Sequence, residues 1–217
     1  MPSEVRCFLI EPTDQLEVSL RRFVMSSQEQ CPAPPRARFP GAMPTALGYH
    51  EARVVIATET GSLESERVNV EHIYQSCDEP ALPDDDERWP WFCECGYEFQ
   101  PGDHRQTNRT QLYRRADTGE LTTIDAAPAG AMWNATWYVR SFGASFTRHD
   151  PSWCLEMKTP AGTWIVDGPA NNGPGWERHG IPPNVAAKPS IGIGDRFHGW
   201  LGGSNGRQPG VLVIDKP

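Results

Sequence analysis

Short runs of apolar and β-branched residues, separated by turns rich in glycine and proline, dominate this chain. Leu16, Val18 and Leu20 alternate with polar residues, which is typical of a strand with one buried face. The run 53–58 is β-branched and resembles a buried strand. No long segment shows the helical period of about 3.6 residues, so few helices are expected. Further strands are predicted over 5–10, 68–74, 111–115, 120–124, 153–158, 163–167, 189–201 and 211–214, and 131–139 is either a strand or a short helix.

Two turns that contain glycine predict hairpins. Ala116-Asp117-Thr118-Gly119 separates 111–115 from 120–124, and Pro160-Ala161-Gly162 separates 153–158 from 163–167. Glycine adopts the positive φ that tight turns require. With the proline-rich stretch 31–44, these patterns predict a mainly β (β-rich α+β) fold of twisted antiparallel sheets and hairpins with long Gly/Pro loops. We expect a single domain over residues 1–217, with an N-terminal β portion (1–75) and a metal-site portion (76–217).

Composition and charge narrow the classes of function. A chain of 217 residues can bury a core without disulfides. The net charge of −8 opposes the phosphate backbone, so non-specific nucleic-acid binding is not expected. No apolar run reaches the roughly 18 residues of a membrane span, and the N-terminus lacks the pattern of a signal peptide. The six cysteines are therefore interpreted as thiols or metal ligands and not as disulfides. Binding to an unidentified protein partner is compatible with this composition.

The densest chemistry lies in Cys93-Glu94-Cys95-Gly96. On or beside a strand, residues two apart point the same way, so both thiols face one side. Zinc binds thiolates at about 2.3 Å, and a following glycine lets backbone amides approach the sulfurs. Cys-x-Cys is a weaker signal than Cys-x-x-Cys, and two buried apolar cysteines are the alternative. The pattern predicts a zinc site with Cys93 and Cys95 as ligands.

Two ligands do not complete a zinc site. Cys77, His104, Cys154 and His198 are the further candidates, and we favour His198 because aromatic residues and glycines flank it. Asp195, three residues earlier, would supply an oxygen ligand or orient the imidazole. The competing interpretation of His198 is a core histidine whose hydrogen bonds are satisfied by its neighbours.

Two other groupings are weaker. The acidic run 84–87 resembles a site for a hard cation, but most charge runs are solvated surface, which is the interpretation we favour. A cysteine nucleophile would pair Cys154 or Cys93 with His149 or His198. Cys154 lies in an apolar run typical of a core strand, which disfavours that chemistry.

Segments along most of the chain resemble a family of uncharacterised actinobacteriophage proteins, which is related to a poorly characterised domain of bacterial ubiquitin-like operons. The segments are Arg6-Cys-Phe-Leu-Ile-Glu-Pro-Thr-Asp, Asp86-Glu-Arg-Trp-Pro, Cys93-Glu-Cys-Gly-Tyr-Glu-Phe, Gln111-Leu-Tyr-Arg, Asp117-Thr-Gly-Glu, Pro128-Ala-Gly-Ala-Met-Trp, Trp164-Ile-Val-Asp-Gly, Arg178-His-Gly-Ile-Pro-Pro, Pro189-Ser-Ile and Asp195-Arg-Phe-His-Gly-Trp-Leu. The resemblance implies that the cysteine pair and His198 converge on a metal. The related domain has Cys at the position of Asp195, so the fourth ligand is Asp195, Cys77, His104 or water.

The expected function is a zinc-stabilised phage protein that acts as a binding or structural module. The alternative is a zinc-dependent hydrolase with an open coordination position and a nearby acid or base. Glu94 lies between the cysteines, but strand alternation would point it away from the metal. A phage origin places the protein in the host cytoplasm during infection, or on the virion.

Overall fold

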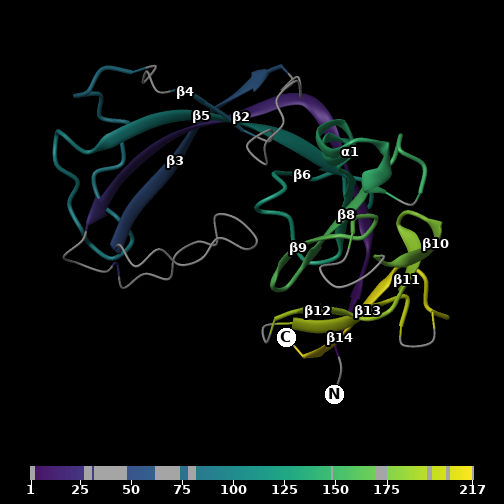
Figure 1. Cartoon of the computed structure of the whole chain (residues 1–217). Coiled ribbons are helices and arrows are strands. Elements are labelled where there is room, and N and C mark those ends of the chain that lie inside the picture. The colour runs from purple at the N-terminus through teal and green to yellow at the C-terminus, as the bar shows by residue number, and fades with distance from the viewer. Residues whose placement is uncertain are drawn as a thin grey trace. The chain divides into compact units, whose positions relative to one another are not determined.

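The computed structural model is mostly β, as predicted (Figure 1). It describes residues 3–26, 31, 48–61, 74–77, 82–147, 149–169, 175–194, 197–203 and 206–216. Its elements are β1 (Ser3–Arg6), β2 (Phe8–Ser26), β3 (Gly48–Thr60), β4 (Tyr74–Cys77), β5 (His104–Arg115), β6 (Leu121–Thr122), β7 (Ala131–Asn134), α1 (Thr136–Phe142), the 3₁₀ helix η2 (Ala144–Phe146), β8 (Leu155–Thr159), β9 (Gly162–Ile165), β10 (Glu177–Ile181), β11 (Asn184–Lys188), β12 (Ile191–Ile193), β13 (Phe197–Leu201) and β14 (Val211–Lys216).

The chain divides into two compact units. The described parts of 1–12 and 113–217 form one, here called the terminal unit, and those of 13–64 and 70–112 form the other, the long-strand unit. β2 and β5 each contribute residues to both. This division differs from the predicted portions 1–75 and 76–217, because the terminal unit contains strands from both ends of the chain. The expectation of one domain stays a prediction.

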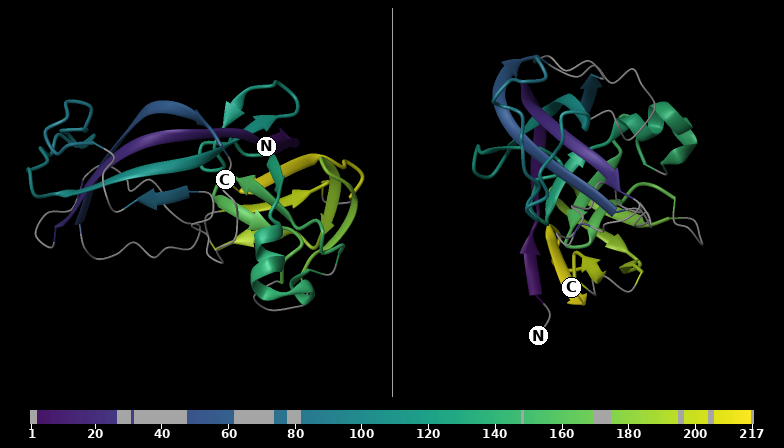
Figure 2. Two further views of the ribbon diagram at one scale, coloured as in Figure 1. Left: turned by 90° about the horizontal axis from the view of Figure 1, so that it is seen from above. Right: turned by 90° about the vertical axis from the view of Figure 1, so that its left-hand side faces the viewer.

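In the long-strand unit, β2 pairs with β3 in an antiparallel register that runs from Gln15 opposite Thr60 to Ser26 opposite Gly48 (Figure 2). The predicted alternation in β2 is confirmed, since Leu16, Val18 and Leu20 are buried. β3 is a strand, as predicted, but it is not buried over its β-branched run, because Val54 and Val55 are exposed. β-Branched residues favour extended backbone even where one face meets solvent.

The opposite face of β2 is polar and is held by cross-strand ion pairs and hydrogen bonds. Arg53 on β3 contacts Glu17 at 2.7 Å and Ser19 at 2.7 Å. Arg21 pairs with Glu51 at 2.5 Å and donates to Gln106 on β5 at 2.7 Å. These contacts join the three long strands and position the start of β3, which carries His50.

In the terminal unit, β1, β14, β13 and β12 form a four-stranded sheet in that order, and the predicted hairpin at Gly162 is confirmed as β8–β9. The hairpin predicted around Gly119 is β5–β6. The segment 131–139, predicted as a strand or a short helix, contains both: the strand β7 comes first and the start of α1 follows.

Alternate residues of β13 and β14 enter the core of the terminal unit with residues of β8 and β11. The core comprises Cys7, Met132, Leu155, Met157, Trp164, Val166, Val185, Ala187, Ile191, Phe197, Leu201, Leu212 and Ile214.

Candidate metal centre

A tight loop carries the cysteine pair. The Cys93 N–H donates to the Tyr97 carbonyl at 2.9 Å, and the Gly96 N–H donates to the Cys93 carbonyl at 2.8 Å. Gly96 has φ +89°, a conformation that glycine adopts without strain. The two cysteines therefore lie on a turn between the bridged residues Phe92 and Glu98, and the turn, not strand alternation, directs their sulfurs.

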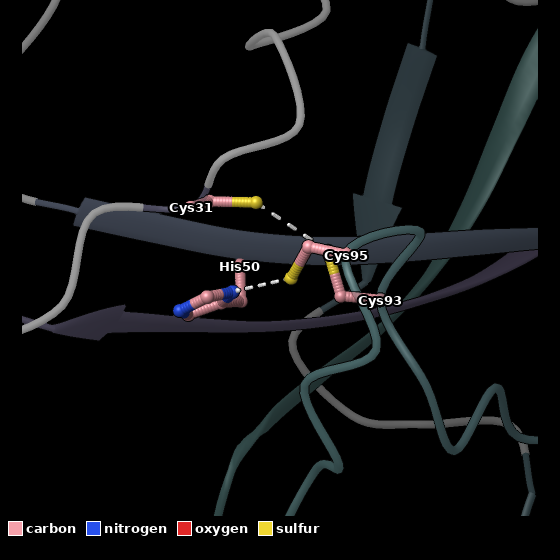
Figure 3. Close-up of side chains that lie close together, drawn as sticks. All are labelled: Cys31, His50, Cys93 and Cys95. Carbon is pink, nitrogen blue, oxygen red and sulfur yellow. Dashed lines mark hydrogen bonds between the residues drawn. The ribbon is translucent and has the colours of Figure 1, made fainter.

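Four side chains converge at this loop: Cys31, His50, Cys93 and Cys95. Their donor atoms all lie within 4.8 Å of one another (Figure 3). The Sγ atoms of Cys31 and Cys93 are 3.7 Å apart, and His50 Nδ1 is 3.2 Å from the Cys95 Sγ. In a tetrahedral zinc site these separations are about 3.8 Å for two sulfurs and about 3.5 Å for sulfur and nitrogen. The four donors thus form a cluster that can hold a metal ion.

Packing fixes the imidazole of this cluster. His50 lies opposite Val24 in the β2–β3 register and is 3% exposed. Its ring stacks on Tyr97 at a centroid distance of 4.1 Å, and Tyr97 meets the buried Phe99 edge to face. Nδ1 faces the sulfurs, whereas Nε2 is buried without a hydrogen-bond partner. The ring therefore presents Nδ1 as the atom that could bind a metal.

The surroundings of Cys93 favour its thiolate. Burial raises the pKa of this thiol, but backbone hydrogen bonds from Cys95 and Glu51 and side-chain hydrogen bonds with Cys95 and Cys31 outweigh burial, so its pKa lies below the ordinary value. Cysteine binds a metal as the thiolate. Backbone amides that donate hydrogen bonds to the sulfur stabilise its negative charge and are typical of metal-binding cysteines.

The sequence pattern did not indicate Cys31 and His50 as ligand candidates. Cys31 lies 62 residues before Cys93, and His50 lies 45 residues before Cys95. No local spacing links them to the pair, and Cys31 opens a stretch predicted only as loop. Only their residue types, among the 6 cysteines and 6 histidines of the chain, mark them as possible ligands.

The structure gives His198 other partners. It lies on β13 in the terminal unit, with Nε2 3.1 Å from Ser190 Oγ and Nδ1 3.3 Å from Asp215 Oδ2. Asp195 lies outside the described residues. His198 is not part of the cluster, and the ligand role of His198 and Asp195 stays a prediction.

Two other proposed ligands lie on strands of the long-strand unit. His104, at the start of β5, stacks on Phe23 at 5.0 Å. Cys77 ends β4, opposite Thr107. In the acidic run 84–87, Asp84 pairs with Arg105 and Asp86 pairs with Arg88 at 2.9 Å. The hydrogen bond from Arg88 lowers the pKa of Asp86 to about 2. Arginine partners match the surface interpretation of this run.

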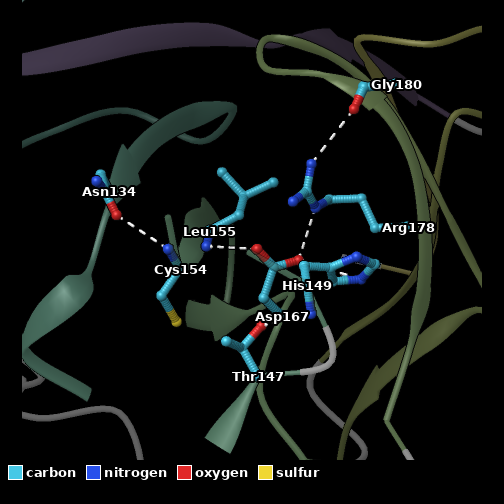
Figure 4. A network of polar contacts seen from close by, with 8 residues as sticks. All are labelled: Asn134, Thr147, His149, Cys154, Leu155, Asp167, Arg178 and Gly180. Carbon is cyan, nitrogen blue, oxygen red and sulfur yellow. Dashed lines mark hydrogen bonds and ion pairs between the residues drawn. The ribbon is translucent and has the colours of Figure 1, made fainter. Parts of the chain in front are cut away.

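Cys154 belongs to a buried polar network in the terminal unit (Figure 4). Asp167 accepts hydrogen bonds from the Leu155 N–H at 2.8 Å and from Arg178 Nε at 2.6 Å, and His149 Nε2 lies 3.7 Å from it. Burial, aided by the charge of Asp167, raises the pKa of the Cys154 thiol to about 12. A thiol held neutral in this way is a poor nucleophile, which argues against Cys154 as a cysteine nucleophile.

No family model, curated protein or solved structure matches this chain. Within the part of the chain that the structure describes, no helix has the length and apolar character needed to cross a membrane.

Proposed function

We propose that Cys31, His50, Cys93 and Cys95 bind one zinc ion, and that the protein is a zinc-stabilised binding or structural module. The observation that carries the proposal is the mutual approach of four donor atoms within 4.8 Å. Three thiolates and one imidazole form a donor set that zinc favours, whereas calcium and magnesium favour oxygen.

The position of the donors supports a structural role. The ion would tie residue 31, the start of β3 and the Cys93–Tyr97 turn together, across sequence separations of 62 and 45 residues. In zinc-finger peptides such a site contributes about 10–16 kcal/mol of apparent binding free energy, which becomes folding free energy. Zinc would thus set the local structure of the long-strand unit.

The coordination number separates this proposal from a zinc hydrolase. A hydrolytic zinc keeps a position for water, whereas four protein ligands complete the tetrahedral shell. The donor set of three cysteines and one histidine therefore favours the scaffold. The phage origin and action in the host cytoplasm, on an unidentified protein partner, belong to the same proposal and are supported by the resemblance of the segments quoted above.

X-ray absorption at the zinc edge tests the proposal. We expect a shell of three sulfurs at about 2.3 Å and one nitrogen at about 2.0–2.1 Å. His50→Ala should remove the nitrogen ligand, and the matched variant His198→Ala should leave the spectrum unchanged. A shell of two sulfurs with oxygen, altered by His198→Ala but not by His50→Ala, would instead support the ligand set of Cys93, Cys95, His198 and Asp195 and an open position.

A further inference from the structure

Three polar side chains form a relay on the four-stranded sheet of the terminal unit. His198 Nε2 lies 3.1 Å from Ser190 Oγ, and His198 Nδ1 lies 3.3 Å from Asp215 Oδ2. The Trp200 Nε1–H donates to the same Asp215 oxygen at 2.9 Å. None of these residues belongs to the proposed zinc site, so the relay is an independent feature.

Strand alternation places the histidine and the serine on the outer face. Along β13, Phe197, Gly199 and Leu201 are buried, so His198 and Trp200 between them point outward. Ser190 immediately precedes β12, and it lies two residues before Gly192, which pairs with His198. The sheet thereby brings residues 190 and 198 together across neighbouring strands.

A β-bulge completes the arrangement. His198 pairs with Lys216 of β14 but Gly199 pairs with Ile214, so Asp215 is the extra residue between them. Bulges redirect side chains and are frequent beside active sites. Here the bulge lies beside the histidine, and the Asp215 carboxylate faces its Nδ1.

The contacts favour one tautomer of His198. A carboxylate 3.3 Å from Nδ1 favours the tautomer in which Nδ1 carries the proton. In that tautomer Nε2 has a lone pair that can accept a hydrogen bond from the Ser190 hydroxyl. The order of groups, hydroxyl to imidazole to carboxylate, is that of enzymes that transfer acyl groups through a serine ester.

We propose that Ser190 is a nucleophile toward carboxylic esters with good leaving groups, with His198 as its general base and Asp215 as a positioning residue. Ser190 Oγ attacks the carbonyl carbon while its proton moves to His198 Nε2. The bond to the leaving alcohol breaks, and the alcohol departs with the electron pair and this proton. Water then attacks the acyl-serine with the same base, which releases the acid and restores the hydroxyl.

Exposure sets the expected strength of this chemistry. The side chains of His198 and Asp215 are each 42% exposed, so a reagent can reach them. Water also screens the carboxylate, so its effect is smaller than in a buried relay. Activated esters, and not amides, are therefore the expected substrates.

Labelling of the full-length protein with a fluorophosphonate tests the proposal. Phosphonylation forms a bond from Oγ to phosphorus and expels fluoride, and mass spectrometry of peptides locates the product. We expect labelling at Ser190, none there in Ser190→Ala, and a rate about 10²-fold lower in His198→Gln. Asp215→Asn should slow labelling about tenfold, and Asp215→Glu should restore part of the rate because a carboxylate can again accept a hydrogen bond from Nδ1–H.

Two control variants separate activation from general surface reactivity. Ser152 is an exposed serine, and its backbone N–H bonds to Asp150. His179 is an exposed histidine beside Glu177 at 3.8 Å. Ser152→Ala and His179→Gln should leave both labelling and the hydrolysis of p-nitrophenyl acetate unchanged. Labelling of Ser190 at no more than the rate of Ser152, or at a rate that His198→Gln does not lower, would overturn the proposal whatever the metal content.

Discussion

Glu156, the second residue of β8, is a buried carboxyl group whose protonation should control the stability of the terminal unit. It accepts hydrogen bonds from Trp133 Nε1–H at 3.0 Å and from the Tyr138 hydroxyl at 3.3 Å. Burial raises the pKa of Glu156 from 4.5 to about 7, although the hydrogen bonds from Thr163, Trp133 and Tyr138 oppose the shift.

The raised pKa fixes both the sign and the size of the effect. Between pH 4.5 and about 7 the folded protein holds a proton on Glu156 that the unfolded chain releases. The contribution of Glu156 to the free energy of unfolding is therefore full below pH 4.5 and falls as the pH rises through this window, by about 3 kcal/mol in all. Above pH 7 the loss is complete and the curve becomes flat.

Glu156→Gln removes this titration and keeps the shape of the side chain. Amide hydrogen exchange of β8, corrected for intrinsic rates and measured from about half a unit below this window to about one unit above it, gives the free energy of opening at each pH. The wild-type value minus the Glu156→Gln value should fall by about 3 kcal/mol between pH 4.5 and 7. Glu177→Gln on β10, where the glutamate side chain is 74% exposed, should give no such difference. A flat difference for Glu156→Gln would refute the reasoning.

Two further substitutions test the buried ion pair and the cysteine loop. Arg178→Met should cost about 3–5 kcal/mol in unfolding experiments, because it leaves the fully buried Asp167 carboxylate without its partner at 2.6 Å. The double variant with Asp167→Asn should recover part of that loss, and full additivity of the two changes would contradict the pairing. Gly96→Ala should weaken zinc binding by about 1–2 kcal/mol in a chelator competition, because alanine is strained at φ +89°. Gly102→Ala, with open space at its Cβ and no positive φ, is the matched control, and equal effects of the two would count against the turn.

Local patterns predicted the strands well, because alternation and glycine turns act over a few residues. Leu16, Val18 and Leu20 are buried as their spacing indicates, and the turn at Gly162 joins β8 to β9. Burial of β3 was harder to predict, because the branched side chain of Val55 favours a strand whether or not another layer covers it.

Only the two ligand candidates that are close together in the sequence could be predicted. Cys93 and Cys95 lie in one turn, so their spacing reveals them. His50 reaches the cluster through the long β2–β3 register, and Cys31 through a segment with no strand signal. The surroundings of His198 likewise depend on the bulge in β14, which no local pattern in the sequence reveals.

Native mass spectrometry of the purified protein tests the central claim most directly. We predict one zinc per folded chain, with occupancy lost in Cys31→Ser and in Cys93→Ser, because each removes one of the four donors. A chain that is metal-free and fully folded, or one that retains zinc equally well in Cys31→Ser, would contradict the four-ligand site.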